Sequence, residues 1–303
     1  MVNKRLEPAP SVLYLVGTPI GNLGDLSPRA KSLLKEVSDI ACEDTRHSGS
    51  LLKSIDTKAN IFSFHQHNAK SRIPKFIKLL KEGRSLALIS DAGLPGISDP
   101  GENLVAEARK EMIDVICIPG PSACLTALVS SGLPCDRFSF EGFLPMKGKE
   151  RTKRLLEIAK EKKTMIIYEA PHRLIRLAEE LKEFCGENRP LQVARELTKI
   201  HEQQIGKTIS EVLIYFSKNK PIGEFTLILG GAQDEISSNI NEHELISRMQ
   251  EMINNGSTPS EAARNASKEF NKSRRELYQL IHQNTSKSIE PKNNQGQNNK
   301  YSN

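Results

Sequence analysis

The segment 88–101 (LISDAGLPGISDPG) carries residue types that could bind a small molecule. It follows an apolar run that is short enough to be a buried strand, and it holds two carboxylates, Asp91 and Asp99, among three glycines. Glycine lets the backbone approach a ligand closely, and open α/β sheets bind ligands beyond the carboxyl ends of their strands. The alternative is a tight strand-to-helix connection. Because such a connection does not need this density of Gly, Pro and Asp, we predict one wall of a small-molecule site.

Polar or glycine-rich clusters follow several other apolar runs. Pro19 lies inside the glycine-rich turn after the first run, and the G-x-G-x-x-G spacing of a dinucleotide-binding loop is absent there. At a later turn, backbone N–H groups at a helix start and the Ser122 hydroxyl could hold an anionic or polar ligand group. In the second half of the chain, we expect the clusters at strand ends to converge on a cleft. The clusters are 17–24 (GTPIGNLG), 43–47 (EDTRH), 119–123 (PGPSA), 169–173 (EAPHR) and 195–202 (RELTKIHE).

Short apolar runs and helical segments alternate along the first 130 residues, which predicts a mostly parallel sheet with helices on both faces. The sequence Gly132-Leu133-Pro134 interrupts this pattern, and a second set of strands and helices follows it. The fold class is therefore α/β, with two α/β domains. The expected strands are 11–16, 39–42, 86–89, 115–118, 164–168, 191–194 and 223–229, and the segment 138–143 lies between the two sets without an assigned type. The expected helices are 28–37, 73–81, 102–110, 123–130, one within 147–163, 174–183 and 207–217.

The last part of the chain differs in character. Residues 241–284 have helical spacing, a helix start at 257–261 and a turn at Asn271, which together predict a small helix-turn-helix-like element. Its six Lys and Arg residues balance six Glu residues. RNA binding by this element would use Lys268, Lys272, Arg274 and Arg275, and a small packing bundle is the alternative. The predicted parts are a flexible N-terminus (1–10), two α/β domains (11–132 and 133–233), the helical element (241–284) and a disordered tail (285–303).

Composition limits the class of protein. The chain has 303 residues, a net charge of +6, no Trp and five Cys residues without a CxxC pair, so neither a disulfide framework nor a structural zinc site is expected. Free thiols are typical of a cytoplasmic protein. His65 and His67 lack a nearby third ligand, and we predict no metal. We also expect no membrane span, because the apolar runs are too short, and no signal peptide, because the N-terminus MVNKRLEPAP is polar and Pro-rich where a signal peptide needs an apolar region.

The strongest charge bias lies in the segment 147–163, where eight Lys and Arg residues stand against three Glu residues. The pattern fits the exposed face of a helix joined to a basic loop. Such a face can simply be exposed to solvent, or it can contact the phosphate backbone of a nucleic acid.

Six of these motifs, in this order and spacing, resemble the bacterial ribosomal RNA small subunit methyltransferase I family, a branch of the tetrapyrrole-methylase-like superfamily. They are LYLVGTPIGNLGDLSPRA, CEDTRH, SDAGLPGISDPG, PGPSA, YEAPHR and RELTKIHE, and the resemblance covers roughly residues 11–231. It implies a homodimer and S-adenosylmethionine as methyl donor, bound in a cleft between the two α/β domains. It also implies 2′-O-methylation of a cytidine ribose in the 16S ribosomal RNA of the small subunit. CEDTRH, YEAPHR and the basic segment are similar to the RNA-methylating branch.

The resemblance also implies which residues line the donor pocket. By motif position these are Thr18, Pro19, Asp91, Ala92, Gly93, Ile97, Ser98, Ser122, Ala123, Glu169 and Ala170.

The chemistry of ribose methylation suggests further residues. A methyl sulfonium is already activated, so the enzyme mainly aligns the nucleophile, but a 2′-hydroxyl benefits from a base. We expect Glu169 or Glu196 near the reacting hydroxyl, because each ends a strand beside an Arg, and Glu43 and Asp44 are further candidates. The residues that could hold RNA phosphates are Arg46, Lys147, Lys149, Arg151, Lys153, Arg154, Arg173, Arg195, Lys199, Lys272, Arg274 and Arg275.

Two other functions remain open at this point. A methyltransferase of the same fold that acts on a tetrapyrrole or another small molecule would not need the basic segment or the C-terminal element. An RNA-binding protein without enzymatic activity would leave the glycine-rich cleft without a purpose, and failure to bind S-adenosylmethionine would favour it.

Overall fold

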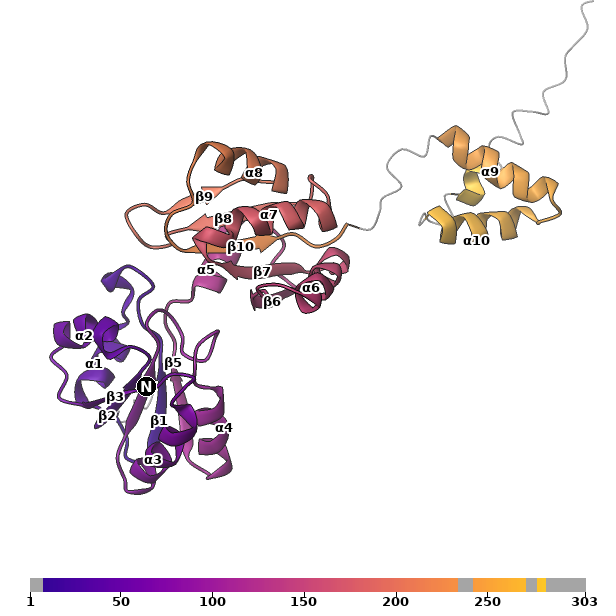
Figure 1. Ribbon diagram of the computed structural model, residues 1–303. Coiled ribbons are helices and arrows are strands. Elements are labelled where there is room, and N and C mark those ends of the chain that lie inside the picture. Colours follow the sequence, from indigo (N-terminus) through magenta and orange to yellow (C-terminus); the bar gives the residue numbers. More distant parts are fainter. Residues whose placement is uncertain (1–7, 234–241, 271–276, 282–303) are drawn as a thin grey trace, which may run out of the picture. The chain divides into compact units, whose positions relative to one another are not determined.

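The structure is a computed structural model, and it describes residues 8–233, 242–270 and 277–281 (Figure 1). The chain divides into two compact units, Met1–Ala232 and Gln233–Asn303. The first unit contains two five-stranded sheets, and the described part of the second is helical. None of the helices in the described ranges combines the length and apolar composition that crossing a bilayer requires.

The first sheet has the strand order β3-β2-β4-β1-β5, and all its neighbouring strands are parallel. This confirms the parallel sheet that the alternating pattern predicts. Its strands are β1 (Val12–Val16), β2 (Asp39–Cys42), β3 (Asn60–Ser63), β4 (Leu86–Ile89) and β5 (Asp114–Ile118). The helices between them are α1 (Pro28–Glu36), α2 (Thr45–Ser54), α3 (Ala69–Lys81) and α4 (Glu102–Lys110).

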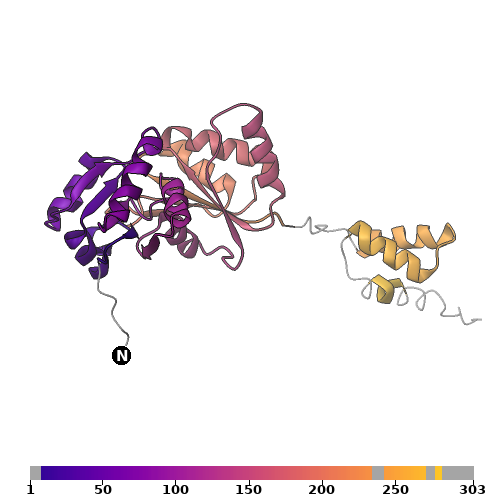
Figure 2. The ribbon, with the colours of Figure 1, turned by 90° about the horizontal axis from the view of Figure 1, so that it is seen from below.

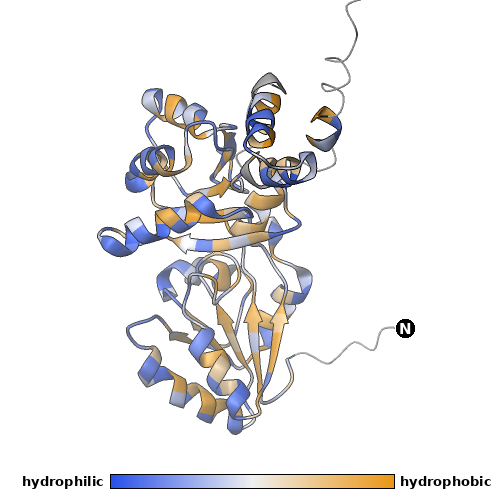
Figure 3. Cartoon of the chain, turned by 90° about the vertical axis from the view of Figure 1, so that its right-hand side faces the viewer, coloured by the Kyte–Doolittle hydropathy of each residue, from blue (hydrophilic) through white to orange (hydrophobic). Residues whose placement is uncertain are grey.

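Helices cover both faces of this sheet because consecutive strand residues point to opposite sides. Val12, Tyr14 and Val16 pack with residues of α1 and α2, whereas Leu13 packs with residues of α3 and α4. Ser27 caps α1, and its side chain accepts a hydrogen bond from the backbone N–H of Ala30. The result is a three-layer unit with its apolar residues on the strands and on the inner helix faces (Figures 2 and 3).

The second sheet has the order β6-β7-β10-β8-β9. It is mixed, because β10 runs antiparallel to both of its neighbours. Its strands are β6 (Phe138–Phe143), β7 (Thr164–Glu169), β8 (Leu191–Arg195), β9 (Gln203–Ile205) and β10 (Phe225–Leu229). The nearby helices are α5 (Ala123–Ser130), α6 (Lys149–Lys160), α7 (Pro171–Cys185) and α8 (Ile209–Lys218).

The two faces of the second sheet are covered by different parts of the chain. Residues of α6, α7 and α8 cover one face. On the other face, α5 packs through Cys124, Ala127 and Leu128 against Ile166 and Ile228 of β7 and β10. We expected α5 in the N-terminal domain, yet its buried side chains contact the second sheet. Helix α5 therefore links the two sheets, because it follows the last strand of the first sheet in the chain and packs its side chains on the second sheet.

Sequence reasoning missed three elements of the first unit. Helix α2 escaped it because this helix begins within the charged cluster and buries only Ser48 and Leu52. Strand β3 has no fully buried residue. Strand β9 is three residues long and begins with two exposed glutamines, so no apolar run marks it. Contacts with neighbouring elements, rather than a strong local sequence preference, therefore hold these three elements in place.

The C-terminal unit contains α9 (Glu242–Asn254), α10 (Pro259–Phe270) and a helical turn at 277–281. Its core is formed by Leu245, Met249, Ala262, Ala263, Ala266, Leu277 and Ile281. The Thr258 hydroxyl accepts a hydrogen bond from the Glu261 N–H, and the Glu261 carboxylate accepts one from the Thr258 N–H, as in a capping box. The predicted turn at Asn271, the N-terminal residues 1–7 and the tail 285–303 lie outside the described residues.

The backbones after β1 and β5 touch each other at two glycines. A Cβ atom on Gly17 would lie 2.7 Å from the Cα of Gly120, and one on Gly120 would lie 2.8 Å from the Cα of Gly17. The obstructing atoms are backbone atoms, which cannot rotate away. This contact sets how closely the turns after the two strands approach.

We predict that Gly17→Ala destabilises the fold by at least about 1–3 kcal/mol, because the new methyl group overlaps backbone atoms. The measurement is the free energy of unfolding from urea denaturation. Gly49→Ala is the matched control, since Gly49 lies in α2 and its added Cβ would meet nothing within 4 Å. That change should be neutral or stabilising by about 0.5–1 kcal/mol. Equal effects of the two substitutions would contradict the close approach.

Candidate functional site

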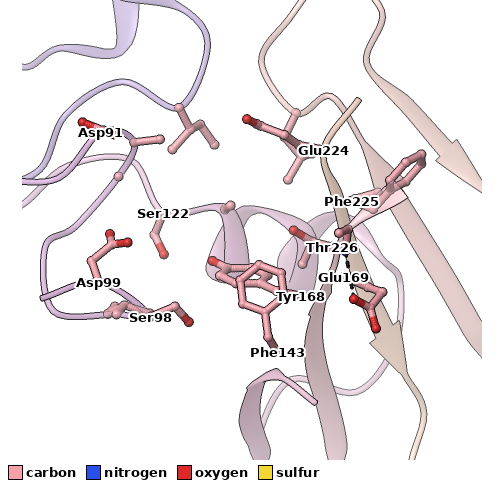
Figure 4. Close-up of a pocket in the computed structure, with 18 of the residues that line it drawn as sticks. Asp91, Ser98, Asp99, Ser122, Phe143, Tyr168, Glu169, Glu224, Phe225 and Thr226 are labelled. Atoms are coloured by element: carbon pink, nitrogen blue, oxygen red, sulfur yellow. Dashed lines mark hydrogen bonds between the residues drawn. The ribbon is translucent and has the colours of Figure 1, made fainter. Parts of the chain in front are cut away.

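A cavity of about 430 Å³ lies between the loops of the first sheet and the strand ends of the second. This volume falls within the range of about 300–1,000 Å³ that is common for small-molecule sites. Asp91, Ser98 and Asp99 lie on one side of it, and Tyr168 and Thr226 lie across from them (Figure 4). The lining residues are Ile20, Asp91, Ala92, Gly93, Leu94, Ile97, Ser98, Asp99, Ser122, Ala123, Phe143, Tyr168, Glu169, Ala170, Pro171, Ala194, Leu197, Gly223, Glu224, Phe225 and Thr226.

The first wall is fixed by the pairing of Thr18 with Gly93. The Thr18 N–H donates to the Gly93 carbonyl at 2.9 Å, and the Gly93 N–H donates to the Thr18 carbonyl at 3.1 Å. The Thr18 hydroxyl also donates to the Ser90 carbonyl at 3.2 Å. Gly93 has φ of +85°, which a residue with a side chain adopts only at a cost. Thr18 is buried and does not line the cavity; it holds the loop that does.

Two aspartates of this wall line the cavity. The Asp91 carboxylate accepts hydrogen bonds from the Asp44 N–H and the Ser48 hydroxyl, each at 3.3 Å. Burial, with the nearby charge of Glu43, raises the pKa of Asp99 to about 6. Ser98 has φ of +63°, an uncommon conformation for a residue with a side chain, directly before Asp99. The loop thus holds a carboxylate that changes its charge close to neutral pH.

The opposite wall combines aromatic and apolar residues with Thr226 and Glu224. The rings of Tyr168 and Phe143 lie with their centroids 5.6 Å apart, and Ala194 and Leu197 lie beside them in the lining. Burial, with the proximity of Cys124, raises the pKa of Tyr168 above its usual value, so its phenol stays protonated near neutral pH. This wall suits a planar or apolar part of a ligand.

Glu169 ends β7 and is 2% exposed. Its Oε1 accepts hydrogen bonds from the Ala170 N–H and Arg173 Nε, both at 2.9 Å. Arg173 also donates to the Leu144 carbonyl at 2.8 Å. The carboxylate therefore serves to join the end of β7, the start of α7 and the loop after β6. Its other oxygen, Oε2, is buried and has no hydrogen-bond partner in the described part of the chain.

Glu196 lies in a network outside the cavity lining. Its Oε1 accepts from the Glu224 N–H at 2.9 Å and from Lys199 Nζ at 3.0 Å. Burial alone raises the pKa of Glu196, but these two hydrogen bonds outweigh it and lower the pKa overall. A carboxylate held in this way is a weak base. Glu43 and Asp44, the other candidate bases, also lie outside the lining.

The structure brings most of the predicted donor-pocket residues together, but not all of them. Asp91, Ala92, Gly93, Ile97, Ser98, Ser122, Ala123, Glu169 and Ala170 line the cavity, whereas Thr18 and Pro19 do not. Sequence reasoning missed Phe143, Tyr168 and Leu197, because aromatic and apolar residues within or beside strands are typical of a core. It also missed 223–226, because β10 is antiparallel and brings its amino end to the cavity.

Four of the predicted phosphate-binding cations outside the basic segment already have protein partners. Arg46 pairs with Asp44 at 2.8 Å, although its side chain is 90% exposed, and Arg173 pairs with Glu169. Arg195 donates to the Ile222 carbonyl and to Gln203, and Lys199 joins Glu196 and Glu224. Their surroundings favour a role in positioning loops.

The basic segment 147–163 is confirmed as a helix joined to a loop, but its cations differ in exposure and in ion pairing. The Arg151 side chain is 4% exposed and pairs with Glu180 at 2.5 Å, so it does not lie on the outer face. Arg154 pairs with Glu141 and Glu157. Lys147, Lys149 and Lys153 are exposed and can contact a polyanion. The predicted cations Lys272, Arg274 and Arg275 lie outside the described residues.

The cavity has the chemistry of an organic-ligand site. Within the residues that the structure describes, no group of three or more His, Cys, Asp or Glu side chains could hold a metal ion. Two aspartates stand on one wall, the other wall is mostly apolar and aromatic but includes Glu224 and Thr226, and a helix begins at Ala123. This arrangement suits a ligand that carries both positive charge and a flat ring.

Comparison with known proteins places this geometry in a family. The family model described as tetrapyrrole (corrin/porphyrin) methylases matches residues 12–213. The chain belongs to this family. The ribosomal RNA small subunit methyltransferase I of Synechocystis sp. is 47% identical over 89% of this chain and 96% of its own length. The protein of the same name from Thermotoga maritima is 44% identical over 73% of this chain and 99% of its own.

Solved structures of the family support the fold. The crystal structure of a uroporphyrin-III C-methyltransferase from Thermus thermophilus, complexed with S-adenosylhomocysteine, superposes with a TM-score of 0.52. The match has 18% sequence identity and covers 72% of this chain and 96% of that one. The relatives of 44–47% identity place the chain within the ribosomal RNA small subunit methyltransferase I branch of the methylase family.

We predict that Glu169→Gln lowers the free energy of unfolding by about 3 kcal/mol or more, because it breaks a buried ion pair and leaves Arg173 uncompensated. Urea denaturation measures this change. Glu224→Gln is the control, because the Glu224 side chain is 74% exposed and the loss of a surface pair costs at most about 1 kcal/mol. If Glu169→Gln costs no more than the control, the carboxylate does not join the elements as described.

Proposed function

We propose that this protein transfers a methyl group from S-adenosylmethionine to the 2′-hydroxyl of a cytidine ribose in 16S ribosomal RNA. The observation that carries the proposal is the 47% identity to a ribosomal RNA small subunit methyltransferase I along 96% of that relative. The cavity at the strand ends supplies a place for the reaction. The substrate is the small ribosomal subunit or its RNA, and the enzyme works in the cytoplasm as a homodimer.

The residues of the cavity fit S-adenosylmethionine, which supplies a methyl group already activated on a positively charged sulfur. Asp91 and Asp99 would face the positive charges, and a carboxylate stabilises a nearby cation most where water is excluded. Tyr168, Ala194 and Leu197 would contact the adenine. Gly93 lets the backbone line the cavity without a side chain, since an added Cβ would already lie 3.3 Å from Ile20 Cγ2.

Asp99 is the residue we place at the reacting hydroxyl. It lines the cavity, whereas Glu196 lies outside the lining and is held by Lys199, and Glu169 is committed to Arg173. A general base works best when its pKa lies near the working pH. In this proposal, Asp99 would accept the proton of the 2′-hydroxyl as the oxygen bonds to the methyl carbon, while the bond from that carbon to the donor sulfur breaks and S-adenosylhomocysteine would leave as a neutral thioether.

The RNA would be held outside the cavity by exposed cations. Lys147, Lys149 and Lys153 follow directly after β6 and are exposed, and phosphate contacts from such residues position RNA without reading its sequence. The C-terminal unit is an accessory in this proposal. The Thermotoga maritima relative is matched over 99% of its length by 73% of this chain, which leaves little room in that relative for a counterpart of this unit.

The test is transfer of tritiated methyl from S-adenosylmethionine to 30S subunits that lack the modification, followed by digestion to nucleosides. We expect label in 2′-O-methylcytidine. Protein with Gly93→Trp, which fills the cavity wall, is the negative control. Transfer to a tetrapyrrole but not to subunits or 16S RNA would favour a small-molecule acceptor. RNA binding without any donor binding would favour a non-enzymatic protein.

The pKa of Asp99 predicts a pH dependence. Below pH 6 its carboxyl is protonated and cannot accept a proton, so kcat/KM should rise with pH up to about 6 and then level off. Asp99→Asn should remove this rise and lower kcat by about 10²–10⁴-fold. Glu43→Gln removes a charge that raises the pKa of Asp99 and should move the rise to lower pH. An unchanged pH profile in Asp99→Asn would exclude Asp99 as the base.

A further inference from the structure

Strand β6 carries a row of three aromatic rings that remain partly exposed, although one of them, Phe143, also lines the cavity. Phe138, Phe140 and Phe143 are 41%, 37% and 55% exposed. The strand lies at the edge of the second sheet. Large apolar side chains exposed together in this way are a sign of an interaction surface.

A β-bulge places the three rings on one face. In a regular strand, side chains alternate, so Phe143 would point away from Phe138 and Phe140. The pairing of β6 with β7 shifts between Phe140 and Gly142, where Gly142 has φ of +60°. The extra residue is Glu141, whose carboxylate pairs with Arg154 of α6. The bulge thus returns Phe143 to the side of Phe138 and Phe140, as bulges often do to redirect a side chain.

The bulge also brings the row to the mouth of the cavity. Phe143 pairs in register with Tyr168, and both residues line the cavity (Figure 4). The Tyr168 ring lies in contact with Phe140 as well, with a centroid distance of 5.1 Å. A Cβ on Gly142 would lie 3.5 Å from the Ser98 hydroxyl of the opposite wall. Phe143 therefore has one part in the cavity and another part exposed at its rim.

We propose that Phe143 is a stacking platform for an unpaired RNA base, at or next to the nucleotide whose ribose enters the cavity. This inference rests on the proposed function and names the part of the RNA that the rim recognises. Sequence-tolerant binding of single-stranded RNA combines aromatic platforms with cations that follow the backbone. Here Lys147, Lys149 and Lys153 follow Phe143 within ten residues, and all three are exposed.

The occupant must be a base rather than only an apolar surface, because the platform is continuous with a reaction site. A ribose can enter the cavity only if its nucleotide leaves the regular stack, and the base then needs a new stacking partner. Phe143 offers a ring at that rim, whereas Phe138 lies at the opposite end of the same strand and does not line the cavity.

The absence of Trp from the sequence allows a direct test. Phe143→Trp places a single tryptophan at the proposed platform, where it can be excited selectively over the five tyrosines, and stacking of a base quenches indole fluorescence. We expect quenching when a short single-stranded RNA containing cytidine is added to protein saturated with S-adenosylhomocysteine. Phe138→Trp is the matched control and should show little quenching. Full quenching by S-adenosylhomocysteine alone, with no further change on adding RNA, would assign the ring to the adenine and overturn the proposal.

Kinetics give a second, independent readout. Phe143→Ala should raise KM for 30S subunits about tenfold, the loss expected for one stacked base, while KM for S-adenosylmethionine stays the same. Phe143→Tyr should restore binding, and Phe143→Leu should not. A rise in KM for S-adenosylmethionine instead, or dissociation of an oligomer by Phe143→Ala in sedimentation, would overturn the proposal. If the wild type transfers no methyl group, the proposed function fails, but the fluorescence titration still decides whether Phe143 takes a base.

Discussion

The cavity depends on the two backbone hydrogen bonds between Thr18 and Gly93. They hold together the turns that follow β1 and β4, strands that are neighbours in the first sheet. The contact between Gly17 and Gly120 adds the turn after β5. With three turns fixed at one edge of the sheet, Asp99 and the start of α5 are placed without relying on flexible side chains. The two hydrogen bonds also hold Gly93 at its positive φ, a backbone conformation that favours glycine.

Charge is divided between the inside of the site and its surroundings. The cavity wall carries carboxylates, and burial, with the nearby charges of Glu43 and Asp91, raises the pKa of Asp99, whereas the exposed lysines after β6 are positive. Such a division suits two ligands of opposite charge. In the proposed function, a cationic donor is attracted into the cavity, while an RNA backbone is attracted to the rim and repelled from the acidic wall. Only the neutral ribose can then approach the carboxylates at little electrostatic cost.

The sequence predicted the fold well because buried strands of a parallel sheet are short apolar runs, and the expected β4 and helix 102–110 were confirmed. It predicted the first wall of the cavity for the same reason, since loops after parallel strands meet at one edge. It could not predict the second wall. An apolar segment does not show whether its strand will be parallel or antiparallel to its neighbours. The sequence therefore did not indicate that the amino end of β10 faces the cavity. Burial is not encoded either, and Arg151 therefore looked like a surface cation although it pairs with Glu180.

The position of α5 has a consequence for synthesis of the chain. This helix follows β5, yet its apolar face rests on Ile166 and Ile228, residues that leave the ribosome much later. A nascent chain that ends near residue 132 would hold a complete first sheet and an uncovered helix. The last strand in the described part of the chain, β10, lies at the centre of the second sheet, so neither that sheet nor the cover for α5 can be completed before it emerges. Until then, the cavity has only one of its two walls.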